Sequence, residues 1–259
     1  MEDSINDKGH VLTHRQDAVM TIEFGHPAHN SLPAHLLDEL VQAIDCASED
    51  AEIKAVVLRS FGERSFCAGA SFQELIEIEN ESQGQAFFSG FARVINAMRR
   101  CKKFIIARVQ GKAVGGGVGI IAAADYALAM ESAAIKLSEL TIGIGPFVIA
   151  PAVARKIGVA GLSALSIDAQ GFRSARWGES KGLYTQVFDS VKAMDSSLNN
   201  LCADISQYNI DAIHALKSVL WEGTEHWDEL LKERAAMSGR LVLSPETKSQ
   251  LAPYKQSNQ

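Results

Sequence analysis

The first thirty residues contain two short segments in which apolar and polar positions alternate, 10–15 and 18–24. Both are rich in valine, isoleucine, threonine and phenylalanine, a composition typical of β-strands. Only the polar pair Gln16-Asp17 separates the two segments. The pattern therefore predicts a β-hairpin at the start of the fold.

Beyond the hairpin, apolar residues recur every three or four positions in two segments, 36–48 and 85–100. This spacing is that of an amphipathic helix. Two β-rich segments, 54–60 and 104–109, each lead into a glycine-bearing turn. Strand, turn and helix thus recur about every fifty residues, an order that predicts an α/β layer structure of approximately repeated units.

The character of the chain changes near residue 189. Short strands are still expected at 126–129 and 184–188, whereas the remaining residues show mainly the helical spacing of apolar positions. We therefore expect an α/β core over residues 1–188 and a helical region over residues 189–259.

Composition places the chain among ordinary globular proteins, since 47% of its 259 residues are hydrophobic and 22% are charged. A formal net charge of −6 disfavours duplex nucleic acid or an anionic membrane surface as the main partner. The four cysteines lie far apart, which predicts neither a disulfide framework nor a zinc site. Residues 1–30 contain no apolar signal segment and no membrane-spanning helix is expected, so the cytoplasm is the expected compartment.

Two glycine-bearing turns are the candidates for chemistry. Segment 110–117 ends in three consecutive glycines and precedes the apolar segment 118–124, which predicts a helix. The first N–H groups of a helix lack intrahelical partners and lie at the positive end of its dipole. Segment 66–71 also follows a strand, so amides from two strand ends can converge on one oxygen atom. From these residues alone, turns that only pack a helix against a sheet remain an equal alternative.

Several ordered motifs resemble those of the enoyl-CoA hydratase/isomerase (crotonase) superfamily. In chain order they are Asn30-Ser31-Leu32, Phe66-Cys-Ala-Gly-Ala70, Gln110-Gly-Lys-Ala-Val-Gly-Gly-Gly117 with Ala123-Ala-Asp125, and Ser138-Glu139 followed by Gly143. The resemblance covers roughly residues 10–240.

The resemblance implies an α/β fold of the crotonase (ClpP-like) type, a spiral of ββα units with a helical C-terminal region. In that arrangement residues 1–188 form the acyl-CoA-binding and catalytic core, and residues 189–259 mediate oligomerisation into a homotrimer or a dimer of trimers. No cofactor and no metal are implied, because the substrate is itself a coenzyme A thioester.

The resemblance also assigns roles to backbone groups. The N–H groups of Ala70 and Gly116 would bind the thioester oxygen and stabilise the negative charge that develops when a neighbouring proton is removed. Further substrate-binding backbone is expected at Ala68, Gly69, Gly115, Gly117 and Gly143.

Hydratases of this family carry two glutamates, and only the second is present in this chain. The first position is Gly119 and the second is Glu139. The family's isomerases keep the glutamate that matches Glu139, and one carboxylate can move a proton between two carbons. Isomerisation is therefore favoured, with hydration through another group as the alternative. A non-catalytic acyl-CoA-binding protein is a further alternative.

The chain also departs from the family pattern. Ser71 replaces the usual aspartate, the bulky Phe147 stands where small residues are usual, and no basic residue occurs between Pro27 and Asn30. The acyl pocket is therefore expected to differ in shape, and the contact to the CoA 3′-phosphate is not located.

Two other groups of residues carry side chains that are common in metal or catalytic sites, three histidines and one cysteine. His26, His29 and His35 lack a neighbouring cysteine or carboxylate cluster, so a metal site is not expected there. Cys67 lacks an assignable histidine partner and is interpreted as a small packing residue.

Overall fold

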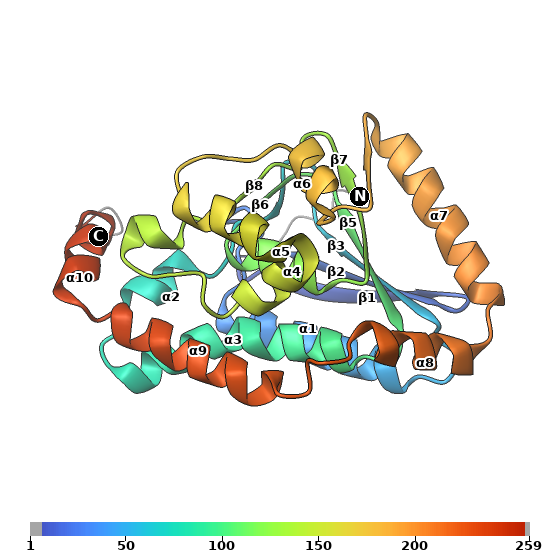
Figure 1. Cartoon of the computed structure of the whole chain (residues 1–259), viewed down its shortest axis with the longest axis horizontal. Coiled ribbons are helices and arrows are strands. Elements are labelled where there is room, and N and C mark those ends of the chain that lie inside the picture. Colours follow the sequence, from blue (N-terminus) through green and yellow to red (C-terminus); the bar gives the residue numbers. More distant parts are fainter. Residues whose placement is uncertain (1–6, 257–259) are drawn as a thin grey trace.

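A computed structural model describes residues 7–256, and the chain folds as a spiral of repeated units (Figure 1). Each unit contributes two strands followed by a helical segment. The elements of the four units are β1 (His10–Gln16), β2 (Val19–Gly25) and α1 (Ala34–Glu49); β3 (Ala55–Ser60), β4 (Ser65–Cys67), α2 (Phe72–Ile76) and α3 (Glu81–Arg100); β5 (Phe104–Val109), β6 (Lys112–Val114) and α4 (Gly116–Ala123); and β7 (Tyr126–Met130), β8 (Ile135–Lys136), the 3₁₀ turn η1 (Glu139–Ile142) and α5 (Ala150–Ile167). The predicted α/β spiral of ββα units is confirmed.

The strands form two sheets, and the units alternate between them. The large sheet has the order β1-β2-β3-β5-β7-β9, where β9 is Gln186–Phe188, and the small sheet has the order β4-β6-β8. Strands β1 and β2 are antiparallel, as the predicted hairpin requires, and the pairs that follow are parallel. Because parallel strands end at the same edge of a sheet, the small sheet brings three strand ends together.

Helices cover both faces of the large sheet. Alternate residues of a strand point to opposite faces. Accordingly, Val56 and Leu58 belong to the core shared with α1 and α3, whereas Ala55 and Val57 pack with Met194 of α7 (Val191–Gln207). Figure 1 shows α7 on one flank of the sheet, away from α1 and α3. Because both faces of the sheet are buried, the sequences of these strands are almost continuously apolar.

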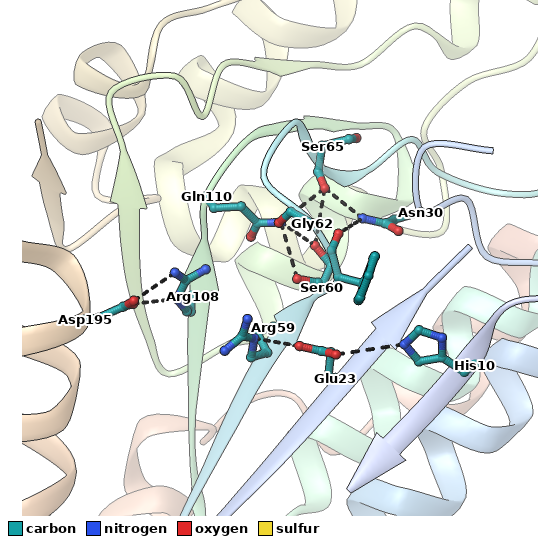
Figure 2. A network of polar contacts seen from close by, with 11 residues as sticks. His10, Glu23, Asn30, Arg59, Ser60, Gly62, Ser65, Arg108, Gln110 and Asp195 are labelled. Atoms are coloured by element: carbon teal, nitrogen blue, oxygen red, sulfur yellow. Dashed lines mark hydrogen bonds and ion pairs between the residues drawn. The ribbon is translucent and has the colours of Figure 1, made fainter. Parts of the chain in front are cut away.

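Two buried amide side chains hold the turn between β3 and β4 (Figure 2). The Nδ2 atom of Asn30 donates to the carbonyl oxygens of Phe61 and Ser65, each at 2.8 Å. The Nε2 atom of Gln110 donates to the Ser60 hydroxyl at 2.8 Å and to the Gly62 carbonyl at 3.0 Å. The motifs that begin with Asn30 and Gln110 therefore orient β4, and through it the loop that follows.

Helices dominate after β9, as predicted, and the last two return to the core. They are α7, α8 (Ile210–Leu220), α9 (Trp227–Leu241) and α10 (Pro245–Gln256), preceded by α6 (Ala175–Lys181). Figure 1 shows α9 lying along α3, and α10 beside α2 at the end of the molecule opposite α7. The helical region is thus continuous with the α/β core.

Some sequence-based expectations were incomplete or wrong. The short strands of the small sheet, together with α2, α5, α6 and α10, were not predicted, and the strand expected at 184–188 begins only at Gln186. Tyr184 lies instead before the strand, buried, with its hydroxyl donating to the Ala133 carbonyl at 2.9 Å. A strand of two or three residues is too short to show a periodic pattern.

No membrane-spanning helix is expected from the sequence, and among the described residues one helix, α5, has the length and hydropathy of a membrane span. Its 18 residues have a mean hydropathy of 1.2 and pass that test by length and composition. The helix is broken at Gly158, which has φ 72° and ψ 164°. It packs against α4, so the apolar residues of its first half are explained by contact with the core.

Candidate active site

A cavity of about 170 Å³ lies where the three strands of the small sheet end. The loop after β4 contributes Ala68, Gly69 and Ala70, and the loop after β6 contributes Gly115 and Gly116. The segment after β8 contributes Ser138 and Glu139, and residues of α2, α3 and the segment 142–149 complete the wall. Residues distant in sequence therefore meet because their strands are parallel neighbours.

The amides of Ala70 and Gly116 are both unpaired at this cavity. Within the described range 7–256, neither N–H donates a hydrogen bond; the bridge beside Ala70 uses instead the Leu32 N–H, which donates to the Gly69 carbonyl at 2.8 Å. The two loops adjoin, since a Cβ built on Gly69 would lie 3.7 Å from the Gly116 nitrogen. Two unpaired donors at one cavity form a site suited to a developing oxyanion.

Local backbone geometry exposes the Gly116 amide. Gly115 has φ 53° and ψ −119°, a conformation that favours glycine, and Gly116 is the first residue of α4. The N–H of a first helical residue has no intrahelical partner. A Cβ on Gly116 would overlap the ring of Phe91, so the residue must remain small. The triple glycine is therefore required by both conformation and packing.

Glu139 places a carboxyl group beside the same loop. A Cβ on Gly115 would lie 3.0 Å from the Glu139 Oε1 atom. The carboxyl is buried, and its Oε2 atom has no hydrogen-bond partner among the described residues. Burial raises the pKa of Glu139 to about 7, and a hydrogen bond from its own backbone N–H opposes part of this effect. A carboxyl with this pKa can both accept and donate a proton near neutral pH.

The C-terminal helix α10 holds the turn that carries Glu139. The Ile144 N–H donates to the Glu139 carbonyl at 3.1 Å, and Gly143 ends the turn in the left-handed conformation. The hydroxyl of Thr247, a fully buried residue of α10, donates to the Gly143 carbonyl at 3.2 Å. The position of Glu139 therefore depends on a segment more than one hundred residues away.

The structure brings six of the eight predicted site residues to the cavity: Ala68, Gly69, Ala70, Gly115, Gly116 and Glu139. The other two do not line it. A Cβ on Gly117 would contact Cys67, and a Cβ on Gly143 would overlap the Thr247 hydroxyl. Direct contact of these two glycines with a substrate stays a prediction, whereas their packing explains why both are small.

The position of the absent first glutamate is filled by another side chain. Gly119 is buried in α4, and a Cβ placed on it would overlap the Cγ2 atom of Ile149. Ile149 is itself buried and lines the cavity. Within the lining of this cavity, Glu139 is the one residue with an ionisable side chain.

Several lining residues were not predicted as part of the site. The largest are aromatic: Phe72, Phe87, Phe88 and Phe91. Phe147 also lines the cavity, as expected from its predicted effect on the shape of the acyl pocket. The spacing of the three phenylalanines in α3 was sufficient to predict a helix with an apolar face. Periodicity does not distinguish a face that packs into the core from one that borders a cavity.

Neither Cys67 nor the histidines His26, His29 and His35 line the cavity. Cys67 is fully buried, and burial raises the pKa of its thiol to about 12, so it stays protonated. Within residues 7–256, no cluster of three or more histidine, cysteine or acidic side chains could hold a metal ion.

The sequence of this chain is similar to those of known acyl-CoA enzymes. The family model described as enoyl-CoA hydratase/isomerase matches residues 14–251. A peroxisomal Δ(3,5)-Δ(2,4)-dienoyl-CoA isomerase of Arabidopsis thaliana is 24% identical over 83% of this chain and 81% of the relative. A short-chain-enoyl-CoA hydratase of Clostridium acetobutylicum is 32% identical, over 52% of each protein. Apart from the Arabidopsis protein, the alignments with the first few curated relatives span about half of each relative's length.

Solved structures support the fold. The crystal structure of an enoyl-CoA hydratase from Bacillus halodurans superimposes with a TM-score of 0.87. The superposition covers 94% of this chain and 99% of that protein, at 20% sequence identity. The mixed α/β core and the helical C-terminal region therefore match structures of the crotonase fold.

Proposed function

The chain belongs to the enoyl-CoA hydratase/isomerase family, and we propose that it isomerises unsaturated acyl-CoA thioesters, with Glu139 as the proton-transfer group. The observation that carries this proposal is the single buried carboxyl in the cavity, beside the loop that contains the unpaired Gly116 amide. An isomerase needs one group that removes a proton from one carbon and returns it to another.

The proposed reaction converts a 3-enoyl thioester into a 2-enoyl thioester. The Glu139 carboxylate takes the proton from C2, the C2–H electron pair forms a C1–C2 double bond, and the carbonyl π pair moves onto oxygen. The N–H groups of Ala70 and Gly116 donate to that oxygen, and each such donor is worth roughly 3 to 4 kcal/mol in the transition state. The carbonyl then re-forms, the double bond moves to C2–C3, and the former C3–C4 π pair takes the proton from Glu139 at C4.

Hydration is the second candidate, because several relatives are named as hydratases. Addition of water requires one group to activate the water and, in the two-glutamate enzymes, a partner carboxylate. Ile149 occupies the space that a side chain at position 119 would need. Loss of one acid/base group typically lowers a rate by about 10²- to 10⁴-fold, so we propose hydration as the slower reaction.

Assays with 3-hexenoyl-CoA and 2-hexenoyl-CoA distinguish isomerisation from hydration as the main activity. We expect conversion of the first into the conjugated 2-enoyl thioester, measured by its ultraviolet absorbance, to be faster than formation of 3-hydroxyacyl-CoA from the second. Faster hydration would reject isomerisation as the main activity. Binding of acyl-CoA thioesters without turnover of any would instead favour a non-catalytic protein.

The pH dependence of isomerisation follows from the raised pKa of Glu139. Only the carboxylate can accept the C2 proton, so kcat/KM is expected to rise with pH and to level off above about 7. An ordinary glutamate would place this rise near its usual value, between pH 4 and 5. A profile of kcat/KM from pH 5 to pH 9 measures the position of this rise. A profile that is already level at pH 5, because the rise is centred below that pH, would contradict the proposed environment of Glu139.

The packing at Gly119 predicts the effect of a single methyl group. Gly119→Ala is expected to lower the free energy of unfolding by about 1 to 3 kcal/mol, because its Cβ overlaps Ile149. Urea denaturation measures this change. For comparison, Gly119→Ala is also introduced into the Ile149→Ala variant. In that background we expect the substitution to lower the free energy of unfolding by a smaller amount, because the overlapping side chain has been removed. An equal loss in both backgrounds would show that Ile149 does not fill this space.

Self-association and location complete the proposal. We propose a homotrimer or a dimer of trimers, because α5 and α8 expose apolar side chains such as Val159, Ile167 and Val219. Contiguous exposed apolar patches mark protein–protein contacts, and we propose that these side chains lie at the contacts between subunits. We also propose that the protein acts in the cytoplasm on acyl-CoA substrates. No cofactor is needed for the proposed reaction, because a proton transfer changes no oxidation state.

A further inference from the structure

We infer that the acyl group is a short, uncharged hydrocarbon chain, and that Phe147 sets the limit on its length. This inference rests on the proposed function and concerns the specificity of the same cavity. Three observations carry it: the chemical character of the lining, the volume of the cavity, and the position of the Phe147 ring.

Among the described residues, the lining contains no basic side chain that could form an ion pair with a negatively charged acyl group. Its side chains are apolar except for Ser138, Glu139 and Ser238, and within this lining no residue is basic. The Ser238 hydroxyl donates to the Arg234 carbonyl at 3.3 Å within α9. A terminal carboxylate on the substrate would lose its hydration and also be repelled by the ionised form of Glu139. The cavity therefore selects against dicarboxylic acyl groups.

The volume restricts the length of the chain. A cavity of about 150 Å³ lined by leucine, isoleucine and phenylalanine accommodates benzene, a molecule of six carbons. The cavity of this protein, about 170 Å³, is similar in size and mostly apolar, and it opens to solvent. It has room for roughly six to seven non-hydrogen atoms at the same packing. We infer that a hexanoyl group fills the cavity and that a decanoyl group exceeds it.

We assign the limit to Phe147 because, of the five lining phenylalanines, it is the one that lies outside the helices. It lies in the segment between η1 and α5, its N–H donates to the Gly145 carbonyl at 2.8 Å, and its ring lines the cavity. A Cβ on Gly145 would overlap that ring, so the ring is folded back over its own turn. Phe147 is only partly buried and lies outside the helices and strands. Its truncation is therefore expected to enlarge the cavity without removing a part of the core.

The test is binding of saturated acyl-CoA thioesters, which cannot be isomerised, to the full-length protein by calorimetry. From butanoyl- to hexanoyl-CoA the Kd is expected to tighten about fourfold per methylene, because each buried methylene contributes ~0.8 kcal/mol. Decanoyl-CoA is expected to bind no more tightly than hexanoyl-CoA. Continued tightening at the same rate up to decanoyl-CoA would overturn the inferred length limit.

Variants at Phe147 test the residue itself. Phe147→Ala is expected to tighten the Kd of decanoyl-CoA at least tenfold, and Phe147→Leu is expected to give a smaller change. The control is Phe172→Ala, because Phe172 is exposed and does not line the cavity; we expect its length profile to equal that of the unmodified protein. An unchanged profile in Phe147→Ala, with the variant folded by circular dichroism, would assign the limit to another residue and reject this part of the inference.

A charged substrate analogue tests the chemical class. Glutaryl-CoA and pentanoyl-CoA have acyl groups of equal chain length that differ in a terminal carboxylate, and we expect the Kd of glutaryl-CoA to be at least tenfold weaker. Equal affinities would reject the selection for uncharged chains. Acyl-CoA binding without any dependence on length or charge would reject this inference alone, whereas absence of binding by every thioester would reject the proposed function as well.

Discussion

Replacement of Glu139 by glutamine is expected to lower kcat/KM for isomerisation by about 10²- to 10⁴-fold, equivalent to roughly 3 to 5 kcal/mol of transition-state stabilisation. Glutamine has nearly the shape of glutamate, but its amide cannot accept the C2 proton. The two proposed oxyanion donors are the backbone amides of Ala70 and Gly116, which donate no hydrogen bond among the described residues. We therefore expect substrate binding to persist in the variant while proton transfer fails.

The same substitution is not expected to destabilise the fold. Burial raises the pKa of Glu139 in the folded protein, so folding favours the protonated form of this group. Any stability from this preference is present in full below the unfolded-state pKa and is lost as the pH rises to about 7. At pH 8 a neutral glutamine avoids burial of the ionised form, and Tm is expected to stay equal or to rise.

The measurement combines initial rates on 3-hexenoyl-CoA with thermal unfolding at pH 8. Glu63→Gln is the matched control, since Glu63 is exposed in the turn between β3 and β4, and we expect it to leave the rate unchanged. Retention of full activity by Glu139→Gln would remove Glu139 from the mechanism. Loss of activity together with a large drop in Tm would indicate a structural effect instead.

Replacement of Asp125 by alanine is expected to lower the free energy of unfolding by about 3 to 5 kcal/mol. Its carboxylate accepts hydrogen bonds from the Lys217 ammonium at 2.6 Å, the Trp221 indole at 2.9 Å and the Ile105 amide at 2.8 Å. The side chains of Lys217 and Asp125 are only 3% and 6% exposed. The variant would leave the buried Lys217 charge without its carboxylate counter-ion, which is more costly than loss of the hydrogen bonds alone.

Urea denaturation and thermal unfolding measure this effect, which corresponds to a decrease in Tm of roughly 6 to 20 °C. The control is Asp38→Ala, because the Arg93–Asp38 pair is about half exposed on both sides and is expected to contribute at most about 1 kcal/mol. An apolar double variant, Asp125→Leu with Lys217→Met, is expected to recover part of the loss. The contradicting result is that Asp125→Ala lowers the free energy of unfolding no more than Asp38→Ala does. That result would show that this buried ion pair does not stabilise the attachment of α8.

Most of the architecture could be predicted from the chain itself. Long segments with regular spacing, such as 36–48 and 85–100, became helices α1 and α3, and the segments 54–60 and 104–109 became adjacent parallel strands. These elements are long enough for their period to identify them. The strands of the small sheet were not predicted, although they carry the site, because each has only two or three residues.

The candidate site was predicted in part, and the limit has a physical cause. The glycine pattern and the family resemblance identified Ala70, Gly116 and Glu139, because a close backbone approach and a carboxylate leave a signature in residue types. The four phenylalanines of α2 and α3 in the cavity wall, the Ile149 side chain against Gly119 and the support of η1 by Thr247 left no such signature. Each depends on which distant segments meet.

The sequence by itself determined the α/β class, the helical C-terminal region and the identity of the candidate catalytic groups. The first two properties follow from local periodicity, and the candidate catalytic groups follow from the resemblance of the ordered motifs to the enoyl-CoA hydratase/isomerase family. Only the tertiary structure decided that Glu139 has a pKa near 7, that one carboxyl faces the cavity, and that the cavity is small and apolar. Burial, cavity volume and packing arise from contacts between residues far apart along the chain, and no local pattern encodes them.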